Sequence, residues 1–323
     1  MRLKLRHFAL ATLAMFTLAS NSFAQDYPTR PVKIIVGFVA GGGPDIVARA
    51  LSIKLQEILG QPFVVDNRPG AGGTLGGAVL AKSPADGYTL MVGETGPLAI
   101  APFVYKTIPY DTLKDFAPVA LVTSEPVLLV SSTKSNIKTL QDLVREAKAN
   151  PGRISYGSSG IGTIHHIVGE AFKAGVGIDM QHVPYKGSGQ SVPAILAGDV
   201  PVLVTSFGGA GAHIRSGALN LLAVSSASRV PLAPNTPSLS ETIKGYDFQS
   251  EIGLLAPAGV PPAIVAKLAA AVKQASESPD FIARFKDTAT VVTYKGPADY
   301  VENLKASLKK YEQAVKLANI QPE

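Results

Sequence analysis

The chain has 323 residues, enough for two domains of ordinary size, and 46% of them are hydrophobic, enough for a substantial core. Its 30 Lys and Arg against 24 Asp and Glu give a formal net charge of +6, but no basic run interleaved with aromatic residues, so nucleic acid is not an expected partner. The chain contains no Cys, which excludes disulfides and a lipid anchor on an N-terminal cysteine.

The first 24 residues have the pattern of a cleaved export signal. Their basic residues are Arg2, Lys4 and Arg6. The apolar run at 8–18 is too short to span a bilayer comfortably, and the small residues Ser22 and Ala24 stand where a signal peptidase recognises them. We therefore predict cleavage after Ala24, a mature chain that begins at Gln25, and a periplasmic location. The alternative is an uncleaved membrane anchor.

Strands and helices alternate over residues 32–92. Strands are predicted at 32–39, 62–65 and 88–92, and helices at 46–59 and 74–82. The first strand is nearly continuous in Val, Ile and Phe, as is typical of a strand buried on both faces. Glycine turns separate the strands from the helices. This alternation predicts an α/β unit with a parallel sheet covered by helices on both faces.

The alternation restarts after Pro126. We predict further strands at 127–130, 154–156, 180–183, 200–204 and 221–224, and helices at 139–149, 163–173 and 191–197. The last part is predicted to hold one strand, at 253–255, and two long helices, at 261–276 and 297–318. Ligands of open α/β sheets bind at the carboxyl ends of the strands. If two such sheets face each other across a hinge, their loops line one cleft between closing domains.

The turn at 38–45, Phe-Val-Ala-Gly-Gly-Gly-Pro-Asp, is the most informative segment of the first half. Its glycines let the backbone approach a ligand closely, and the helix that follows presents free N–H groups and the positive end of its dipole. Together these features suit an anion. Asp45 is placed to cap that helix. The alternative is an ordinary turn whose glycines serve tight packing.

The segment 157–163 repeats this device in the second half, where the hydroxyls of Ser158, Ser159 and Thr163 can bond carboxylate oxygens. His165 and His166 follow in the next helix, and adjacent residues do not share a helix face. With no Cys and no HExxH motif, we predict no metal site and no cofactor. A buried, hydrogen-bonded side chain is the alternative for His166.

Motifs of common enzyme classes are missing from the sequence. There is no GxGxxG, no P-loop and no GxSxG nucleophile elbow, since the glycines at 157, 160 and 162 are spaced GxxGxG. These absences favour a binding protein over an enzyme. Two alternatives stay open: a periplasmic enzyme on the same fold that uses His166 and Asp45, and a receptor that passes a ligand signal to a membrane partner.

A series of short motifs runs through the whole mature chain. They are Tyr27 to Val32, Phe38 to Asp45, Val65 to Gly73, Asp86 to Leu90, Tyr110 to Val119, Tyr156 to His166, His182 to Gly187, Leu221 to Arg229 and Ala256 to Gly259. In this order they resemble the Bug family, the solute receptors of tripartite tricarboxylate transporters.

The resemblance implies a type II periplasmic-binding fold, an α/β architecture of two lobes joined by two crossover strands, here near 119–130 and 248–257, with the ligand cleft between them. Lobe 1 would then comprise residues 25–124 and 250–323, and lobe 2 residues 125–249. The resemblance also implies a small carboxylate as ligand, held mainly by backbone amides, hydroxyls and water. Its partners would be the membrane subunits of the transporter, and we expect the protein itself to be a monomer.

Carried over position by position, the ligand contacts fall on both lobes. They are Phe38, Ala40, Gly41, Asp45 and Thr95 in lobe 1, and Ser158, Thr163, His166, Ser206 and Phe207 in lobe 2.

The chain departs from the family pattern at several positions. Pro201 and Thr205 stand where the family usually has Asp, Gly37 replaces the usual Pro, and Glu94 is unusual after the third strand. These departures point to a solute other than a simple C4 or C5 dicarboxylate. Loss of negative charge would accommodate a more anionic or a larger solute.

Overall fold

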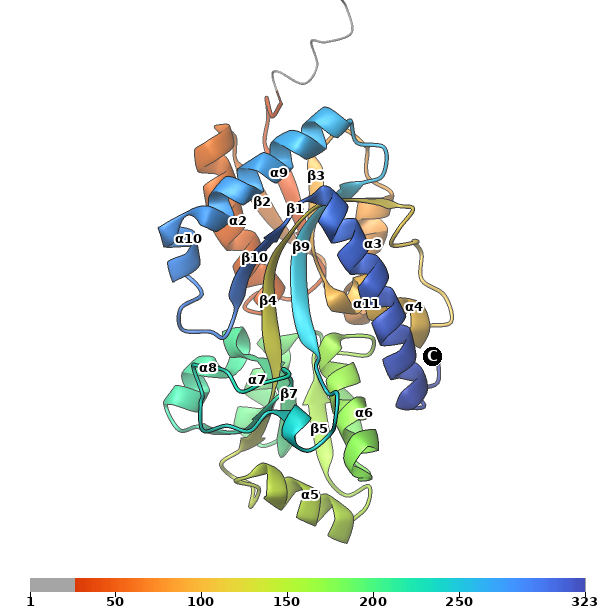
Figure 1. The fold of residues 1–323 in the computed structure, drawn as a ribbon, viewed down its shortest axis with the longest axis vertical. Helices are drawn as coiled ribbons and strands as arrows, with labels where there is room; N and C mark the ends of the chain where they lie inside the picture. Colours follow the sequence, from red (N-terminus) through yellow and green to blue (C-terminus); the bar gives the residue numbers. More distant parts are fainter. Residues whose placement is uncertain (1–26, 323) are drawn as a thin grey trace, which may run out of the picture.

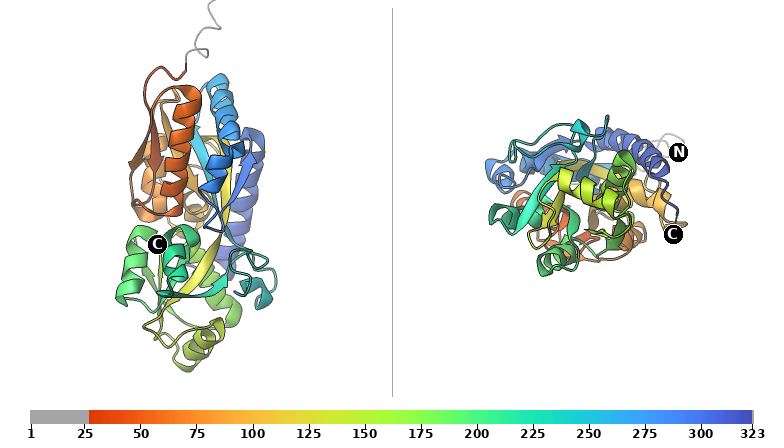
Figure 2. Two further views of the ribbon diagram at one scale, coloured as in Figure 1. Left: turned by 90° about the vertical axis from the view of Figure 1, so that its left-hand side faces the viewer. Right: turned by 90° about the horizontal axis from the view of Figure 1, so that it is seen from below.

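The fold consists of two α/β lobes stacked end to end and connected by long strands (Figures 1 and 2). It is seen in a computed structural model that describes residues 27–322, so the predicted signal peptide at 1–24 lies outside the described residues. None of the helices within 27–322 is long and apolar enough to cross a membrane.

The upper lobe in Figure 1 is built on strands β1 (Val32–Val36), β2 (Phe63–Asn67) and β3 (Thr89–Glu94), which pair in parallel with β1 in the centre. Strand β1 is almost fully buried, as its continuous apolar sequence predicts. The lobe's helices are α2 (Gly43–Leu59), α3 (Thr74–Ala81), the π-helical turn η2 (Gly96–Ile100), α4 (Ala101–Val104), α9 (Pro262–Glu277), α10 (Pro279–Ala283) and α11 (Pro297–Leu317).

The lower lobe has a parallel core of β5 (Ser155–Ser158) between β6 (Gln181–Pro184) and β7 (Val202–Ser206). Strand β8 (Leu219–Val224) pairs antiparallel with β4 (Phe116–Ser132), which lies between β8 and β7. The lobe's helices are α5 (Leu140–Ala149), α6 (Ile164–Val176), α7 (Ser188–Ala197) and α8 (Phe207–Arg215).

Two strands, β4 and β9 (Gln249–Pro257), run through the junction of the lobes (Figure 1). Up to Pro126, β4 pairs antiparallel with β9, and from Val127 onward it pairs with β7 of the lower lobe. One continuous strand therefore belongs to two sheets, and its change of partner marks the hinge. This arrangement confirms the predicted two-lobed fold with two crossover strands.

The prediction of purely parallel sheets covered by helices was too simple. β9 pairs antiparallel with β3, and β10 (Val291–Lys295), which we did not predict, pairs antiparallel with β4. The last part of the chain therefore holds two strands rather than one. The β-branched run at 290–293 was an available signal for β10. Helix α8 was also missed, because its Gly-rich sequence FGGAGAHIR has low helix propensity.

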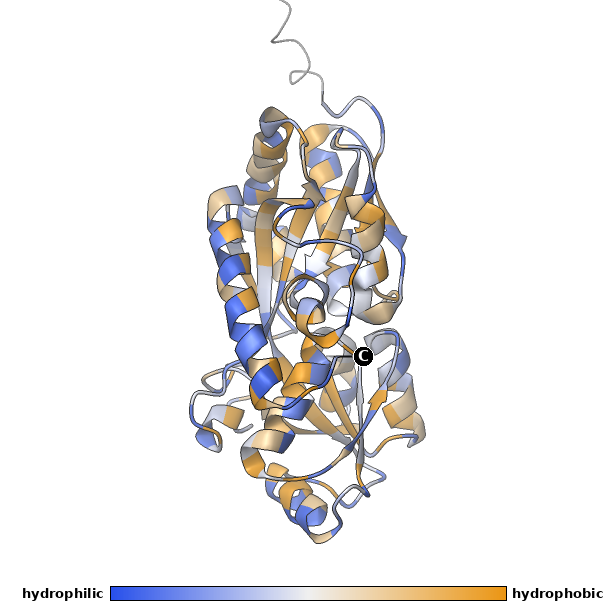
Figure 3. Ribbon diagram, turned by 90° about the vertical axis from the view of Figure 1, so that its right-hand side faces the viewer, coloured by the Kyte–Doolittle hydropathy of each residue, from blue (hydrophilic) through white to orange (hydrophobic). Residues whose placement is uncertain are grey.

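Each lobe has its own core. Figure 3 shows apolar strands enclosed by helices whose outer turns are hydrophilic. In the upper lobe, Val32, Ile34 and Leu51 are fully buried between β1 and α2. In the lower lobe, Tyr156 packs with apolar side chains of α6 and β7. The lower core also takes in Ile100 and Val104 of the upper lobe and Tyr311 and Val315 of α11, so the two lobes are packed together in this closed arrangement.

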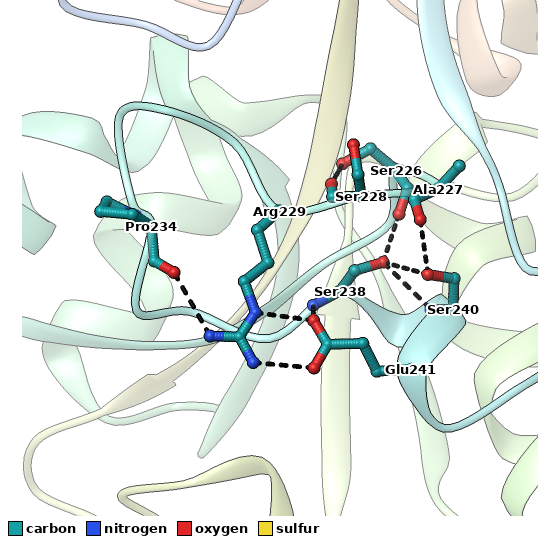
Figure 4. A network of polar contacts seen from close by, with 8 residues as sticks. All are labelled: Ser226, Ala227, Ser228, Arg229, Pro234, Ser238, Ser240 and Glu241. Atoms are coloured by element: carbon teal, nitrogen blue, oxygen red, sulfur yellow. Dashed lines mark hydrogen bonds and ion pairs between the residues drawn. The ribbon is translucent and has the colours of Figure 1, made fainter.

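The loop that follows β8 is held by polar contacts instead of regular structure (Figure 4). Arg229 donates through Nε and Nη2 to the two carboxylate oxygens of Glu241, each at 2.7 Å, and through Nη1 to the Pro234 carbonyl at 3.3 Å. Ser238 donates to the Ser226 carbonyl and accepts from the Ser240 amide. These bonds fix the connection that leads from the lower lobe back to β9.

Candidate functional site

The parallel strands of both lobes end at one cleft. Phe38 follows β1, Glu94 ends β3, Ser159 follows β5 and Ser206 ends β7, and these residues line a single cavity. We call it the inner cavity. Its walls are Phe38, Gly42, Gly43, Pro44, Glu94, Glu125, Ser159, His165, Ser188 and Ser206. In this closed arrangement it holds about 10 Å³, roughly the room of a single water molecule, so a solute can enter only when the lobes move apart.

A second, outer cavity of about 200 Å³ shares Phe38 and Ser159 with the inner one. It is lined by the glycine turn at 70–73 of the upper lobe and by 159–161 and 184–186 of the lower lobe. Both cavities are thus built from both lobes, which is the arrangement that the two glycine loops predict.

The lobes touch each other around these cavities. Tyr105 of the upper lobe donates a hydrogen bond to the Ile161 carbonyl of the lower lobe at 2.9 Å. A Cβ atom on Gly189 would lie 2.6 Å from the Ala40 carbonyl oxygen across the cleft. A Cβ on Gly72 would likewise overlap the Ile161 carbonyl oxygen. The structure is therefore a closed arrangement of the two lobes.

Two carboxyl groups form the floor of the inner cavity at the hinge. Glu94 and Glu125 are only 4% and 3% exposed. Ser250 donates to Glu94 Oε1 at 2.6 Å, and Thr290 donates to Glu125 Oε2 at 2.8 Å. Burial raises the pKa of Glu94 to about 7. Burial, together with the nearby charge of Glu94, also raises the pKa of Glu125 to about 7.

The opposite wall is polar but uncharged. His165 Nδ1 lies 2.6 Å from Ser159 Oγ, which lies 3.3 Å from Ser188 Oγ. Burial lowers the pKa of His165 to about 4, so its ring is neutral near pH 7. Among the described residues, His165 Nε2 and Ser206 Oγ are buried without a hydrogen-bond partner. Buried polar atoms are nearly always paired, so these two are free to bind a ligand.

Helix N-termini also face the inner cavity. Helix α2 begins at Gly43 and α8 at Phe207, and neither has a side-chain cap. Their first N–H groups are therefore left for another acceptor. Helix α6 differs, because the Thr163 hydroxyl accepts from the His166 amide and caps it. α2 begins three residues before the predicted start at Ile46, so the glycines at 42–43 belong to the cavity wall.

Phe38 and Ser206 are the predicted ligand contacts that line the inner cavity. Phe207 starts α8 beside Ser206 and is buried among the apolar side chains of the lower lobe. Ala40 lies at the contact between the lobes, opposite Gly189.

The other predicted contacts in the upper lobe hold its loops in shape. The Asp45 carboxylate accepts from the Gly41 amide, from Arg49 and from Asn67, each at 3.0 Å. It therefore closes the glycine turn on itself. Thr95 Oγ1 accepts from the backbone amide of Glu251 at 2.9 Å and so ties the end of β3 to β9.

The other predicted contacts in the lower lobe are engaged within that lobe. Ser158 Oγ lies 2.7 Å from His182 Nε2, and Thr163 donates to the Gly160 carbonyl at 2.6 Å. The His166 ring stacks on His182 with centroids 4.3 Å apart. Of the two adjacent histidines, His165 is the one on the inner cavity wall.

Sequence reasoning named Ser159 among the hydroxyls of the second glycine loop, but it did not select Glu125, His165 or Ser188 as site residues. Glu125 had a usable signal, because it is a lone carboxylate between the apolar stretches 119–122 and 127–130 of one strand. Ser188 and His165 had none, since many similar residues stand elsewhere in the chain. Within residues 27–322, no group of His, Asp and Glu is arranged to hold a metal ion.

A family model and several relatives of similar length point to one group of proteins. The family described as "Tripartite tricarboxylate transporter family receptor" matches residues 47–320. Protein BugT of Bordetella pertussis is 36% identical over 284 residues, covering 85% of this chain and 86% of the relative.

Two solved structures from Rhodopseudomonas palustris have the same fold. Rpa4515 with adipate is 32% identical with a TM-score of 0.89, covering 92% of this chain and 100% of that one. MatC with bound malate is 30% identical with a TM-score of 0.85, covering 90% of this chain and 100% of that one.

Proposed function

Since this chain belongs to the receptor family of tripartite tricarboxylate transporters, we propose that it captures a small organic carboxylate between its lobes for the membrane subunits of such a transporter. The family consists of periplasmic solute-binding receptors and not of enzymes. The solved relatives with adipate and malate support a carboxylate as the class of ligand.

The observation that carries this proposal is the inner cavity itself. Strand ends from both lobes and the uncapped N-terminus of α8 meet there, with an unpaired hydroxyl on Ser206. Helix N-termini attract anions through free N–H groups and the helix dipole. No Lys or Arg lines the inner cavity, so backbone amides and hydroxyls supply the attraction to a carboxylate.

The predicted ligand contacts fit the proposal in two ways. Phe38 and Ser206 would meet the solute directly. Asp45, Thr95 and Thr163 would act by holding the loops that form the walls. The proposed lobes, 25–124 with 250–323 and 125–249, are supported by the change of β4 partners after Pro126.

A thermal-shift screen of small organic acids, followed by solution scattering, tests the proposal. A solute that binds only the native protein raises its melting temperature, because binding adds RT ln(1 + [L]/Kd) to stability. The bound protein is expected to be a monomer with a smaller radius of gyration than the free protein, since the lobes close on the solute. Melting temperatures that no organic acid changes would overturn the proposal. An unchanged radius with demonstrated binding would contradict closure.

Export is proposed from the N-terminal sequence. We expect the mature protein to begin at Gln25 and to be found in the periplasmic extract, because basic residues, a short apolar run and Ala24 follow one another there. Intact-mass spectrometry of that extract measures the start directly. A chain that keeps residues 1–24 and stays in the membrane fraction would contradict the prediction.

A further inference from the structure

The inner cavity holds two acidic side chains and no cation. Glu94 and Glu125 are both buried, and each accepts one hydroxyl hydrogen bond. No Lys, Arg or His among the described residues forms an ion pair with either of them or lowers its pKa. Ionised carboxylates enclosed without a partner are costly, so a cationic group bound between them would stabilise their charged forms.

The Glu125 carboxyl group lies at the start of helix α2. Its Oε1 atom lies 2.7 Å from the Cβ position of Gly43, the first residue of α2, and α2 has no side-chain cap. The positive end of this helix therefore faces a carboxyl group that belongs to the protein. A solute carboxylate placed here would meet Glu94 and Glu125 and be repelled.

The lower lobe supplies groups that can bind the carboxylate of a solute. Ser206 Oγ and His165 Nε2 are unpaired in the wall, and α8 begins beside them without a cap. These groups can bond carboxylate oxygens without competition from a protein carboxyl. The cavity is thus polarised, with acceptors at the hinge and an anion site on the lower lobe.

We propose that the solute of this receptor carries a cationic N–H group as well as a carboxylate, with the nitrogen bound by Glu94 and Glu125 and the carboxylate by the lower lobe. This inference rests on the proposed function and narrows its solute class to amino-carboxylates. It also corrects the expectation, drawn from Pro201 and Thr205, that the site has lost negative charge, because the cavity floor itself is acidic.

Calorimetry with matched pairs of solutes tests the assignment. The members of each pair have the same number of carbon atoms, and one of them carries an amino group where the other has a carboxylate oxygen or a hydroxyl group: 4-aminobutanoate and succinate, 6-aminohexanoate and adipate, alanine and lactate, aspartate and malate. In the best pair, the amino member is expected to bind at least tenfold more tightly at pH 7.5. Glu94→Gln and Glu125→Gln should each remove most of that preference, since Gln keeps the size and the bond to Ser250 or Thr290 but not the charge.

Glu251→Gln is the matched control. Glu251 lies on β9 near the hinge, but its carboxylate bonds Asn303 and Ser307 outside the inner cavity. The Glu251→Gln variant should therefore prefer the amino member of each solute pair as strongly as the parent protein does. Circular dichroism checks that every variant is folded.

The possible outcomes separate the two proposals. Dicarboxylates or hydroxy acids that bind the parent as tightly as their amino partners would overturn this inference and leave the proposed function standing. So would a preference for the amino member that survives in both Gln variants. Tight binding of simple amines without a carboxylate would overturn the assignment of the lower lobe. If no organic acid of either kind binds, the proposed function itself fails.

Discussion

Replacing Gly189 with alanine is expected to weaken solute binding by about 5- to 150-fold while the protein stays folded. Gly189 lies in the first turn of α7, where a Cβ atom would sit 2.6 Å from the Ala40 carbonyl oxygen and 3.0 Å from a Val39 methyl group. Both neighbours belong to the upper lobe. The added methyl group therefore opposes the closed arrangement and not the fold of either lobe.

The magnitude follows from the cost of overpacking. Forcing a methyl group into a packed contact costs about 1–3 kcal/mol. If this whole cost falls on the closed, solute-bound state, solute binding weakens by about 5- to 150-fold. The substitution should not destabilise the lower lobe, because alanine favours the helical conformation over glycine by roughly 0.5–1 kcal/mol.

Calorimetry on the solute found in the screen, with scattering on the same samples, measures this effect. The variant should bind weakly and keep a larger radius of gyration at a solute concentration that closes the parent. Gly296→Ala is the control, because its new methyl group would meet only the Tyr294 side chain at 3.4 Å or beyond. Parent-like affinity of the Gly189 variant would show that binding does not need this contact between the lobes.

The second large effect is expected in the pH dependence of stability. Glu94→Gln combined with Glu125→Gln should make the solute-free protein more stable than the parent at pH 8 and about equally stable at pH 4.5. Burial raises both carboxyl pKa values from 4.5 to about 7, so the folded state holds protons that the unfolded state has released. The stability due to these protons is complete below pH 4.5 and is lost as the pH rises through 7.

The size of this effect follows from the same shift. A pKa unit corresponds to 1.36 kcal/mol, so one such carboxyl costs on the order of 3 kcal/mol above pH 7. A change of that size moves the melting temperature of a protein this large by about 5 °C or more. Equal melting temperatures of parent and double variant at pH 8 would contradict the prediction.

Buried histidines change stability with pH in the opposite direction, so their effect must be distinguished from that of the two carboxyl groups. Burial lowers the pKa of His165 and His166 to about 4 and that of His182 to about 3. Their contribution to stability is present above pH 6.5 and is lost as the pH falls through 4. Because parent and double variant share these histidines, the difference between their melting temperatures at each pH isolates Glu94 and Glu125.

Most secondary structure was predictable because its signals are local. β1 is continuous in β-branched residues, α5 begins at a Thr139–Asp142 capping box, and Gly60 ends α2 in the left-handed conformation. The motif order predicted the two-lobed architecture. Among the elements that were missed, α8 has a Gly-rich sequence of low helix propensity, and β10 depends on its pairing with β4, which is distant in the sequence.

The composition of the site was decided by tertiary structure. The sequence by itself determined that glycine turns precede helices in both halves of the chain, and from these turns it predicted two anion-binding loops. It could not show that Glu125 on β4 reaches the first turn of α2, or that His165 and not His166 faces the cavity. Local propensities act over a few residues, whereas these contacts join segments more than 80 residues apart through the packing of two lobes at a hinge. Only that packing places two carboxyls beneath a neutral wall and so sets the charge that a solute must carry.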